Sequence, residues 1–92
     1  MVDVTLLIVF DMDSYYNVYV NGELYHEDRT LDTTDLAWCL CTTCKNLGGI
    51  RSLEVIELEL MNIHVADIPE NLTTYASIEE FDENVGEEER LG

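Results

Sequence analysis

The sequence predicts an α+β fold: a four-stranded mixed sheet, in the strand order 3-2-1-4, with one main helix packed on it and a short acidic C-terminal helix. The segment 2–28 is rich in β-branched and aromatic residues and contains Asn21-Gly22, a strong hairpin signal. A segment of helical periodicity then precedes another apolar strand at 53–60. The 92 residues suit one domain, with a core at 1–64 and an acidic segment at 65–92.

The first predicted strand, residues 2–11, is enriched in Val and Ile and is apolar on both faces. A strand that is covered on both faces belongs inside a sheet. Asp11, Asp13 and Ser14 then supply the residues of a turn. The two faces of the strand are Val4, Leu6, Ile8 and Phe10 on one side and Thr5, Leu7 and Val9 on the other.

The second and third strands, at 15–20 and 23–27, flank the Asn21-Gly22 turn. A two-residue turn pairs the residues on either side of it, and strict alternation extends that register along both strands. The predicted pairs are Val20 with Glu23, Val18 with Tyr25, and Asn17 with His26.

The main helix follows the hairpin. Asp32 suits the N-cap, Asp35 favours the positive end of the helix, and Gly48-Gly49 ends it. At about 100° per residue, Trp38 falls on the side opposite the apolar face. That face is predicted to hold Leu36, Ala37, Leu40, Cys44 and Leu47.

The fourth strand is predicted at 53–60. A right-handed crossover through the helix places it parallel to the first strand and beside it. Its alternation sends Glu57 and Glu59 to one face of the sheet and the apolar residues to the other. The apolar residues are Ile56, Leu58 and Leu60.

The segment 65–92 carries nine acids and one Arg, which is a denser negative charge than the rest of the chain. Ser77 and Glu80 match a capping box, so a short helix is predicted to begin there, and Gly86 is predicted to stop it. We expect this segment to be packed on the core or to be partly flexible.

The charge of the whole chain is its strongest compositional feature. Twenty Asp and Glu against four Lys and Arg give a net charge of −16, so direct binding to nucleic acid is disfavoured. Three clustered cysteines make a poor disulfide framework and indicate reduced thiols in a cytoplasm. The apolar run at the N-terminus lacks a basic region, and no run reaches the ~20 apolar residues of a membrane span.

A zinc site at Cys39, Cys41 and Cys44, completed by His26 or His64, is the first chemical alternative. On one regular helix, however, Cys39 points about 160° away from Cys41. Buried thiols are therefore the preferred interpretation, and no metal or cofactor is predicted. His64 is expected to have a hydrogen-bonded structural role.

The sequence LLIVFDMDSYY offers a second alternative. It resembles the first motif of the haloacid dehalogenase-like phosphatases, an apolar strand that ends in Asp-x-Asp. That resemblance would make Asp11 the nucleophile, Asp13 the general acid/base and Mg²⁺ the cofactor. Here Ser14-Tyr15 stands where the family has Gly-Thr, and a tight hairpin replaces the crossover helix. We therefore interpret both aspartates as turn residues and predict no enzyme activity.

The carboxylates remain as the basis of a functional prediction. Glu57 and Glu59 lie two residues apart on a strand, about 6.6 Å from one another, and a second group lies on the C-terminal helix. Like charges this close repel one another, and a cationic partner would relieve that repulsion. The predicted partner-binding residues are Glu57, Glu59, Glu79, Glu80, Asp82 and Glu83, with Trp38 as an apolar anchor. The alternative for Trp38 is that the C-terminal segment covers it.

In size, acidity and aromatic content the chain resembles, as a class, the small phage-encoded inhibitors of host defence: the anti-restriction and anti-CRISPR proteins. This resemblance implies a non-enzymatic mimic of nucleic-acid charge that blocks a Lys/Arg-rich groove of a nuclease in the host cytoplasm. The alternative is a protein–protein adaptor or a module that dimerises through a sheet edge. A solvated acidic face and adaptation to high salt are the remaining explanations of the charge.

Overall fold

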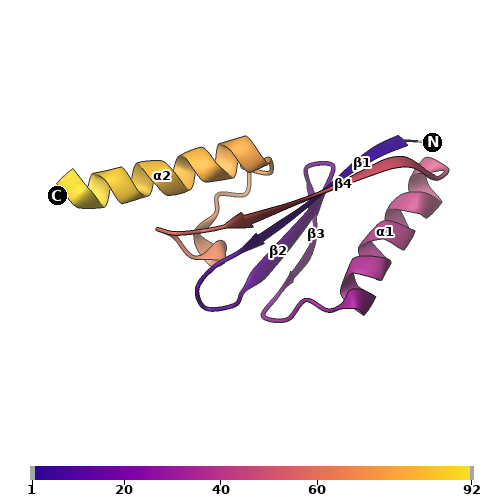
Figure 1. Cartoon of the computed structure of the whole chain (residues 1–92), viewed down its shortest axis with the longest axis horizontal. Coiled ribbons are helices and arrows are strands. Elements are labelled where there is room, and N and C mark those ends of the chain that lie inside the picture. Colours follow the sequence, from indigo (N-terminus) through magenta and orange to yellow (C-terminus); the bar gives the residue numbers. More distant parts are fainter. Residues whose placement is uncertain (1, 92) are drawn as a thin grey trace.

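Four strands form one sheet in the order β3-β2-β1-β4, with a helix on each side of it (Figure 1). The computed structural model describes residues 2–91, without the side chains at 43–44, 46–47 and 89–91. The predicted fold class and strand order are confirmed. The elements are β1 (Val2–Phe10), β2 (Tyr16–Val20), β3 (Glu23–Asp28), α1 (Thr33–Leu47), β4 (Ile50–Glu59), the 3₁₀ turn η1 (Val65–Asp67) and α2 (Tyr75–Leu91).

The central strand β1 pairs antiparallel with β2 and parallel with β4, as the crossover argument predicted. It is buried on both faces, because α1 covers one face and η1 with the start of α2 covers the other. The α1 side buries Val4, Leu6, Ile8, Val18, Val20 and Cys39. The α2 side buries Leu7, Val9, Tyr19, Leu58, Leu60, Val65 and Ile78, so residues beyond 64 contribute to the core.

The hairpin register differs from the prediction after its first pair. Asn21 and Gly22 both have positive φ, as a tight two-residue turn requires, and Val20 pairs with Glu23. A β-bulge between Val18 and Tyr19 then leaves Tyr25 as the extra residue of β3. The predicted pairs of Val18 with Tyr25 and Asn17 with His26 are therefore wrong. The observed pairs are Tyr19–Leu24, Val18–His26 and Asn17–Glu27.

The start of α1 agrees with the sequence, but its buried face is rotated. Asp32 Oδ1 accepts the N–H of Asp35 at 2.9 Å, and Asp35 Oδ2 accepts the N–H of Asp32 at 3.1 Å. Cys39 is fully buried, whereas Ala37, predicted on the apolar face, is exposed. The helix buries Cys39 between half-buried Leu36 and Leu40 because these three positions form one strip against the sheet. The predicted contacts of Cys44 and Leu47 lie outside the described side chains.

The C-terminal helix α2 is longer than the sequence predicted. Its cap is Thr74: the Ser77 N–H donates to Thr74 Oγ1 at 3.3 Å, and the Thr74 N–H donates to Ser77 Oγ at 3.2 Å. The predicted capping box at Ser77 and Glu80 is therefore wrong. Gly86 does not stop the helix either, because it is buried within α2 at a close packing contact with Asn62. Over the part of the chain that is described, neither helix is both long and apolar enough to cross a membrane.

Candidate functional site

Five glutamates line the solvent side of α2. At about 100° per residue, Glu79, Glu83 and Glu87 follow a line that turns by about 40° at each step, Glu80 lies beside Glu87, and Glu88 lies at the far edge, about 180° around the axis from Glu79. Four of the five are exposed, and Glu79 is half-buried. With a rise of about 1.5 Å per residue, they span roughly 13 Å of the helix axis. We call this surface the α2 acidic face: Glu79, Glu80, Glu83, Glu87 and Glu88.

The α2 acidic face carries negative charge that the described side chains do not neutralise. None of the ion pairs among the described residues includes one of its carboxylates. A hydrogen bond to Glu79 raises the pKa of Tyr75, and the negative charges of Glu79 and Glu83 raise it further. The Tyr75 phenol, at the start of α2, therefore lies in a negative electrostatic potential.

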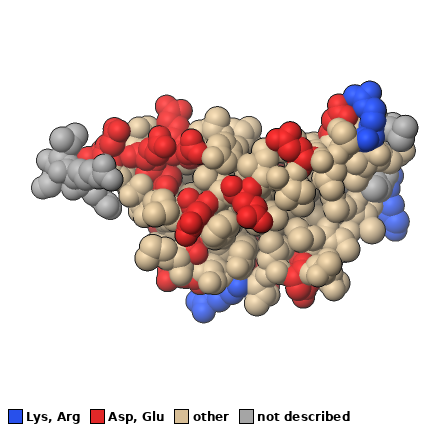
Figure 2. Space-filling model, in the orientation of Figure 1, with Lys and Arg blue, Asp and Glu red and all other residues tan. Residues whose placement is uncertain are grey.

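The basic residues whose side chains the structure describes, Arg29, Lys45 and Arg51, lie outside α2. Arg51 Nη2 donates to Asp3 Oδ2 at 2.7 Å, and the same pair is joined through Nε at 3.0 Å. Hydrogen bonds from Arg51 and Ser52 lower the pKa of Asp3. Figure 2 shows red carboxylates close together over the end of the molecule that α2 forms, and further red side chains over the middle of this face, at its lower edge and beside the blue side chains at the opposite end. In this view the blue side chains lie only at that opposite end and along the lower edge.

The helix that carries this face projects from the sheet. The start of α2 packs on the core through Ile78, but its C-terminal part extends past the ends of the strands (Figure 1). The molecule measures 50 × 23 × 18 Å, and the 17 residues of α2 account for about 25 Å of length. As far as Gly86, one side of α2 packs on the core and on the loop after β4, so a groove would receive the helix from its solvent side.

Asp82 is not part of this surface, although the sequence grouped it with its acidic neighbours. The residue is only 5 % exposed. Its carboxylate accepts the backbone N–H groups of Asn62 and Ile63 through Oδ1, at 2.8 and 3.0 Å, and that of Met61 through Oδ2, at 3.0 Å. Asp82 therefore attaches α2 to the loop after β4 and is not accessible to a partner.

The other predicted contact residues lie in two further places. Glu57 and Glu59 are exposed on β4, but they alternate with Leu58, which faces α2, and so belong to the opposite face of the sheet. Trp38 is 58 % exposed on α1, with its ring centroid 6.4 Å from that of Tyr25. Figure 1 places α1 at the far end of the sheet from α2. The structure thus brings only the glutamates of α2 together.

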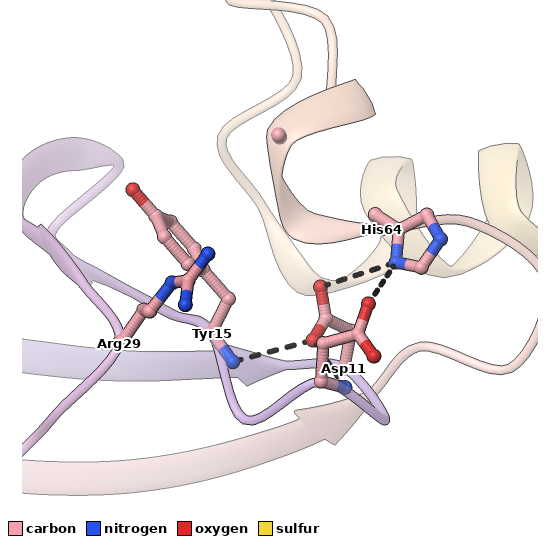
Figure 3. A pocket seen from close by; sticks show the side chains of 6 residues that line it. Asp11, Tyr15, Arg29 and His64 are labelled. Carbon is pink, nitrogen blue, oxygen red and sulfur yellow. Dashed lines mark hydrogen bonds and ion pairs between the residues drawn. The ribbon is translucent and has the colours of Figure 1, made fainter.

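A pocket of about 530 Å³ opens where β1 ends, and Asp11 forms its floor (Figure 3). Asp11 Oδ1 accepts the N–H groups of Asp13 and Tyr15 at 2.9 and 3.2 Å, and Oδ2 accepts that of Val65 at 2.8 Å. Burial raises the pKa of Asp11, but these three hydrogen bonds, with the charge of His64, outweigh it and lower the pKa overall. The carboxylate fixes both the turn after β1 and the start of η1.

His64 joins this pocket from the loop that follows β4. Its Nδ1 lies 3.1 Å from Asp13 Oδ2 and 3.8 Å from Asp11 Oδ2, and its side chain is 62 % exposed. Parallel strands that are neighbours end at the same edge of a sheet, so the segments after β1 and β4 meet there. Sequence reasoning assigned Asp11 and Asp13 to a turn and His64 to a structural role, and it did not predict that the three side chains lie close together.

The cysteines form no comparable cluster in the described residues. Cys39 is buried under the sheet, whereas Cys41 is exposed, which agrees with their predicted divergence on the helix. Among the described side chains, Asp11, Asp13 and His64 form a group of three possible metal ligands whose donor atoms lie close together. Comparisons of the chain with protein-family models, with curated proteins and with solved structures find no match.

Proposed function

We propose that this protein is a non-enzymatic acidic inhibitor that occupies a Lys/Arg-rich, nucleic-acid-binding surface of another protein, such as a host defence nuclease. One observation carries the proposal: the α2 acidic face presents five carboxylates on a helix that projects from the sheet, with no ion pair to them among the described side chains. A protein that binds nucleic acid gains affinity by pairing its basic side chains with closely spaced negative charges. The α2 acidic face offers such charges, three of them along one line of the helix: Glu79, Glu83 and Glu87.

The spacing along the helix supports this match. Glu79, Glu83 and Glu87 follow one another at about 6 Å along the axis, one helical turn apart. Like charges four residues apart destabilise a helix by about 0.2–0.5 kcal/mol per pair. A basic groove would relieve that repulsion, and it would accelerate association in a manner that depends strongly on salt. The class resemblance to phage-encoded inhibitors of host defence points to the same kind of partner.

A second candidate function is a protein–protein module without charge mimicry. Leu53 and Val55 are exposed on β4, which is an edge strand of the sheet. Such an edge can pair with a strand of another chain or of a second copy. Trp38 is a further exposed apolar side chain. This candidate predicts binding that is insensitive to the charge of α2.

Capture of proteins from a bacterial lysate, at low and high salt, tests the two candidates. The α2 triple variant (Glu80→Gln, Glu83→Gln, Glu87→Gln) removes three charges from the α2 acidic face. The matched control, the β triple variant (Glu23→Gln, Glu27→Gln, Glu54→Gln), removes the same number of exposed charges from the strands.

The proposal expects the wild type and the β triple variant to capture a nucleic-acid-binding protein, and the α2 triple variant to lose it. Duplex DNA added in excess should release the captured protein, because both compete for one basic surface. Capture that survives both the α2 triple variant and the DNA competitor would overturn the proposal. If Leu53→Ser then abolished that capture, the edge-strand candidate would replace it.

A further inference from the structure

We propose that Asp11, Asp13 and His64 bind one divalent transition-metal ion of the Zn²⁺ or Mn²⁺ type at the end of the sheet where β1 and β4 terminate. The proposed inhibitor does not require this site, so each proposal can fail without the other. Two residues of the site follow β1 and the third follows β4, so their meeting is a product of the fold. The site lies in the pocket shown in Figure 3.

The donor atoms are close enough to share one ion. Two donors bound at about 2.0–2.2 Å from the same metal, at angles of about 90–110°, lie roughly 2.8–3.6 Å apart. His64 Nδ1 is 3.1 Å from Asp13 Oδ2 and 3.8 Å from Asp11 Oδ2, and all three donors lie within 4.8 Å of one another. Asp13 and His64 are largely exposed, so small rotations of their side chains can bring the donors to equal distances from an ion.

The mixture of donors selects the type of ion. An imidazole nitrogen suits zinc and related transition metals, and the two carboxylates with water suit Mn²⁺ as well, whereas Mg²⁺ and Ca²⁺ prefer sites made of oxygen ligands alone. His64 is therefore the residue that separates this site from an ordinary cluster of acids. Three protein ligands leave coordination positions for water on the side that faces the pocket.

Asp11 gives the site a fixed point. Its side chain is 3 % exposed, and three backbone N–H groups hold both of its oxygens in place. Metal-ligating carboxylates are commonly oriented by hydrogen bonds of this kind. Arg29 also lines the pocket, on the Tyr15 side and away from His64 (Figure 3). A bound ion would join the turn after β1 to the loop before η1.

Titration of the full-length protein with Mn²⁺, after treatment with a chelator, tests the proposal. Thiols bind Mn²⁺ poorly, so the cysteines interfere less than they would with Zn²⁺. The paramagnetic ion should broaden the NMR signals of the amides of residues 11–15 and 63–66 first. Two variants with exposed side chains, His64→Gln and Asp13→Asn, should each weaken binding by about tenfold or more. Asp11 is left unchanged because its removal would disturb the fold.

The matched control replaces two neighbouring exposed acids, Asp67→Asn and Glu70→Gln, and should bind Mn²⁺ as the wild type does. Mg²⁺ at the same concentration should not compete. Equal binding by His64→Gln and the wild type would overturn the proposal. So would broadening that begins at the α2 acidic face, because it would indicate general attraction of cations to a chain of charge −16. Amide spectra of each variant in chelator confirm that the fold is retained.

Discussion

A Cβ atom at Gly86 would lie 2.6 Å from the side-chain nitrogen of Asn62, closer than two such atoms can approach. Asn62 Nδ2 donates to the carbonyl of Asp82 at 2.9 Å, so the amide is held against the helix. The glycine therefore permits α2 to cross the loop after β4 at close range. It is needed for packing, and the helix continues through it.

Gly86→Ala should be coupled to Asn62. Alanine favours a helix interior by about 1 kcal/mol over glycine, but here its methyl group displaces the Asn62 amide from its hydrogen bond. In the background of Asn62→Ala the clash is gone, so the same substitution should stabilise the protein. Denaturant unfolding of the four proteins in this cycle should give a coupling free energy of about 1–2 kcal/mol. Additive effects would show that the two residues are not in contact.

Asp82→Ala should be far more damaging than Glu83→Ala. The first leaves three backbone N–H groups in the loop after β4 without their acceptor, which should cost about 2–3 kcal/mol of unfolding free energy. The second removes an exposed carboxylate on the same helix and should change stability by less than about 0.5 kcal/mol. Similar losses for the two variants, measured by urea unfolding, would contradict the role of Asp82 in attaching α2.

Gly86 and Asp82 have roles that the sequence alone did not predict. Alternation and turn chemistry predicted the strands and the hairpin, because each depends on near neighbours in the chain, and the handedness of the crossover placed the fourth strand beside the first. The roles of Gly86 and Asp82 depend on a loop about 20 residues away, and a helix with glycine or aspartate looks the same in sequence whether that loop is near or far. The β-bulge at Val18 and Tyr19 was missed for another reason: an even alternation carries no mark of one extra residue.

The candidate sites also combine features that the sequence predicted with features that depend on distant contacts. The acidity of residues 79–88 was visible in the sequence, and the helical period spreads five of those carboxylates over about half of the helix circumference, on its solvent side. The separation of Glu57, Glu59 and Trp38 from them was not visible, because it depends on which sheet face each helix covers. The meeting of Asp11 with His64 did have a signal. The predicted parallel pairing of the first and fourth strands implies that the residues after them are neighbours.

Tyr19 should make stability fall at alkaline pH. Burial raises its pKa above the ordinary 10.0, and the charge of Glu27 raises it further, against a hydrogen bond from Asn17 that lowers it. The folded protein therefore holds this proton more tightly than the unfolded chain does. The contribution is fully present below about pH 10 and is lost as the pH rises through the folded pKa.

The variant Tyr19→Phe isolates this contribution. The phenyl ring fills nearly the same space, loses the contact with Asn17 Nδ2, 3.1 Å in the wild type, and cannot ionise. The unfolding free energy of the wild type should therefore fall relative to that of the variant as the pH rises through the folded pKa of Tyr19. Parallel curves over the alkaline range would contradict the predicted pKa, and absorbance titration of the phenols provides an independent measurement.

The melting temperature should rise with salt, because a charge of −16 repels itself and screening shortens that repulsion to about 10 Å at moderate ionic strength. The α2 triple variant should melt higher than the wild type at low salt, by an amount equivalent to about 1 kcal/mol, and should respond less to added salt. The β triple variant undergoes the same change in net charge on strands where acids are less crowded, so it should gain less. Equal gains would mean that repulsion is spread over the whole chain and that the α2 acidic face is not a local concentration of charge. A wild-type melting temperature that does not change with salt would contradict both expectations.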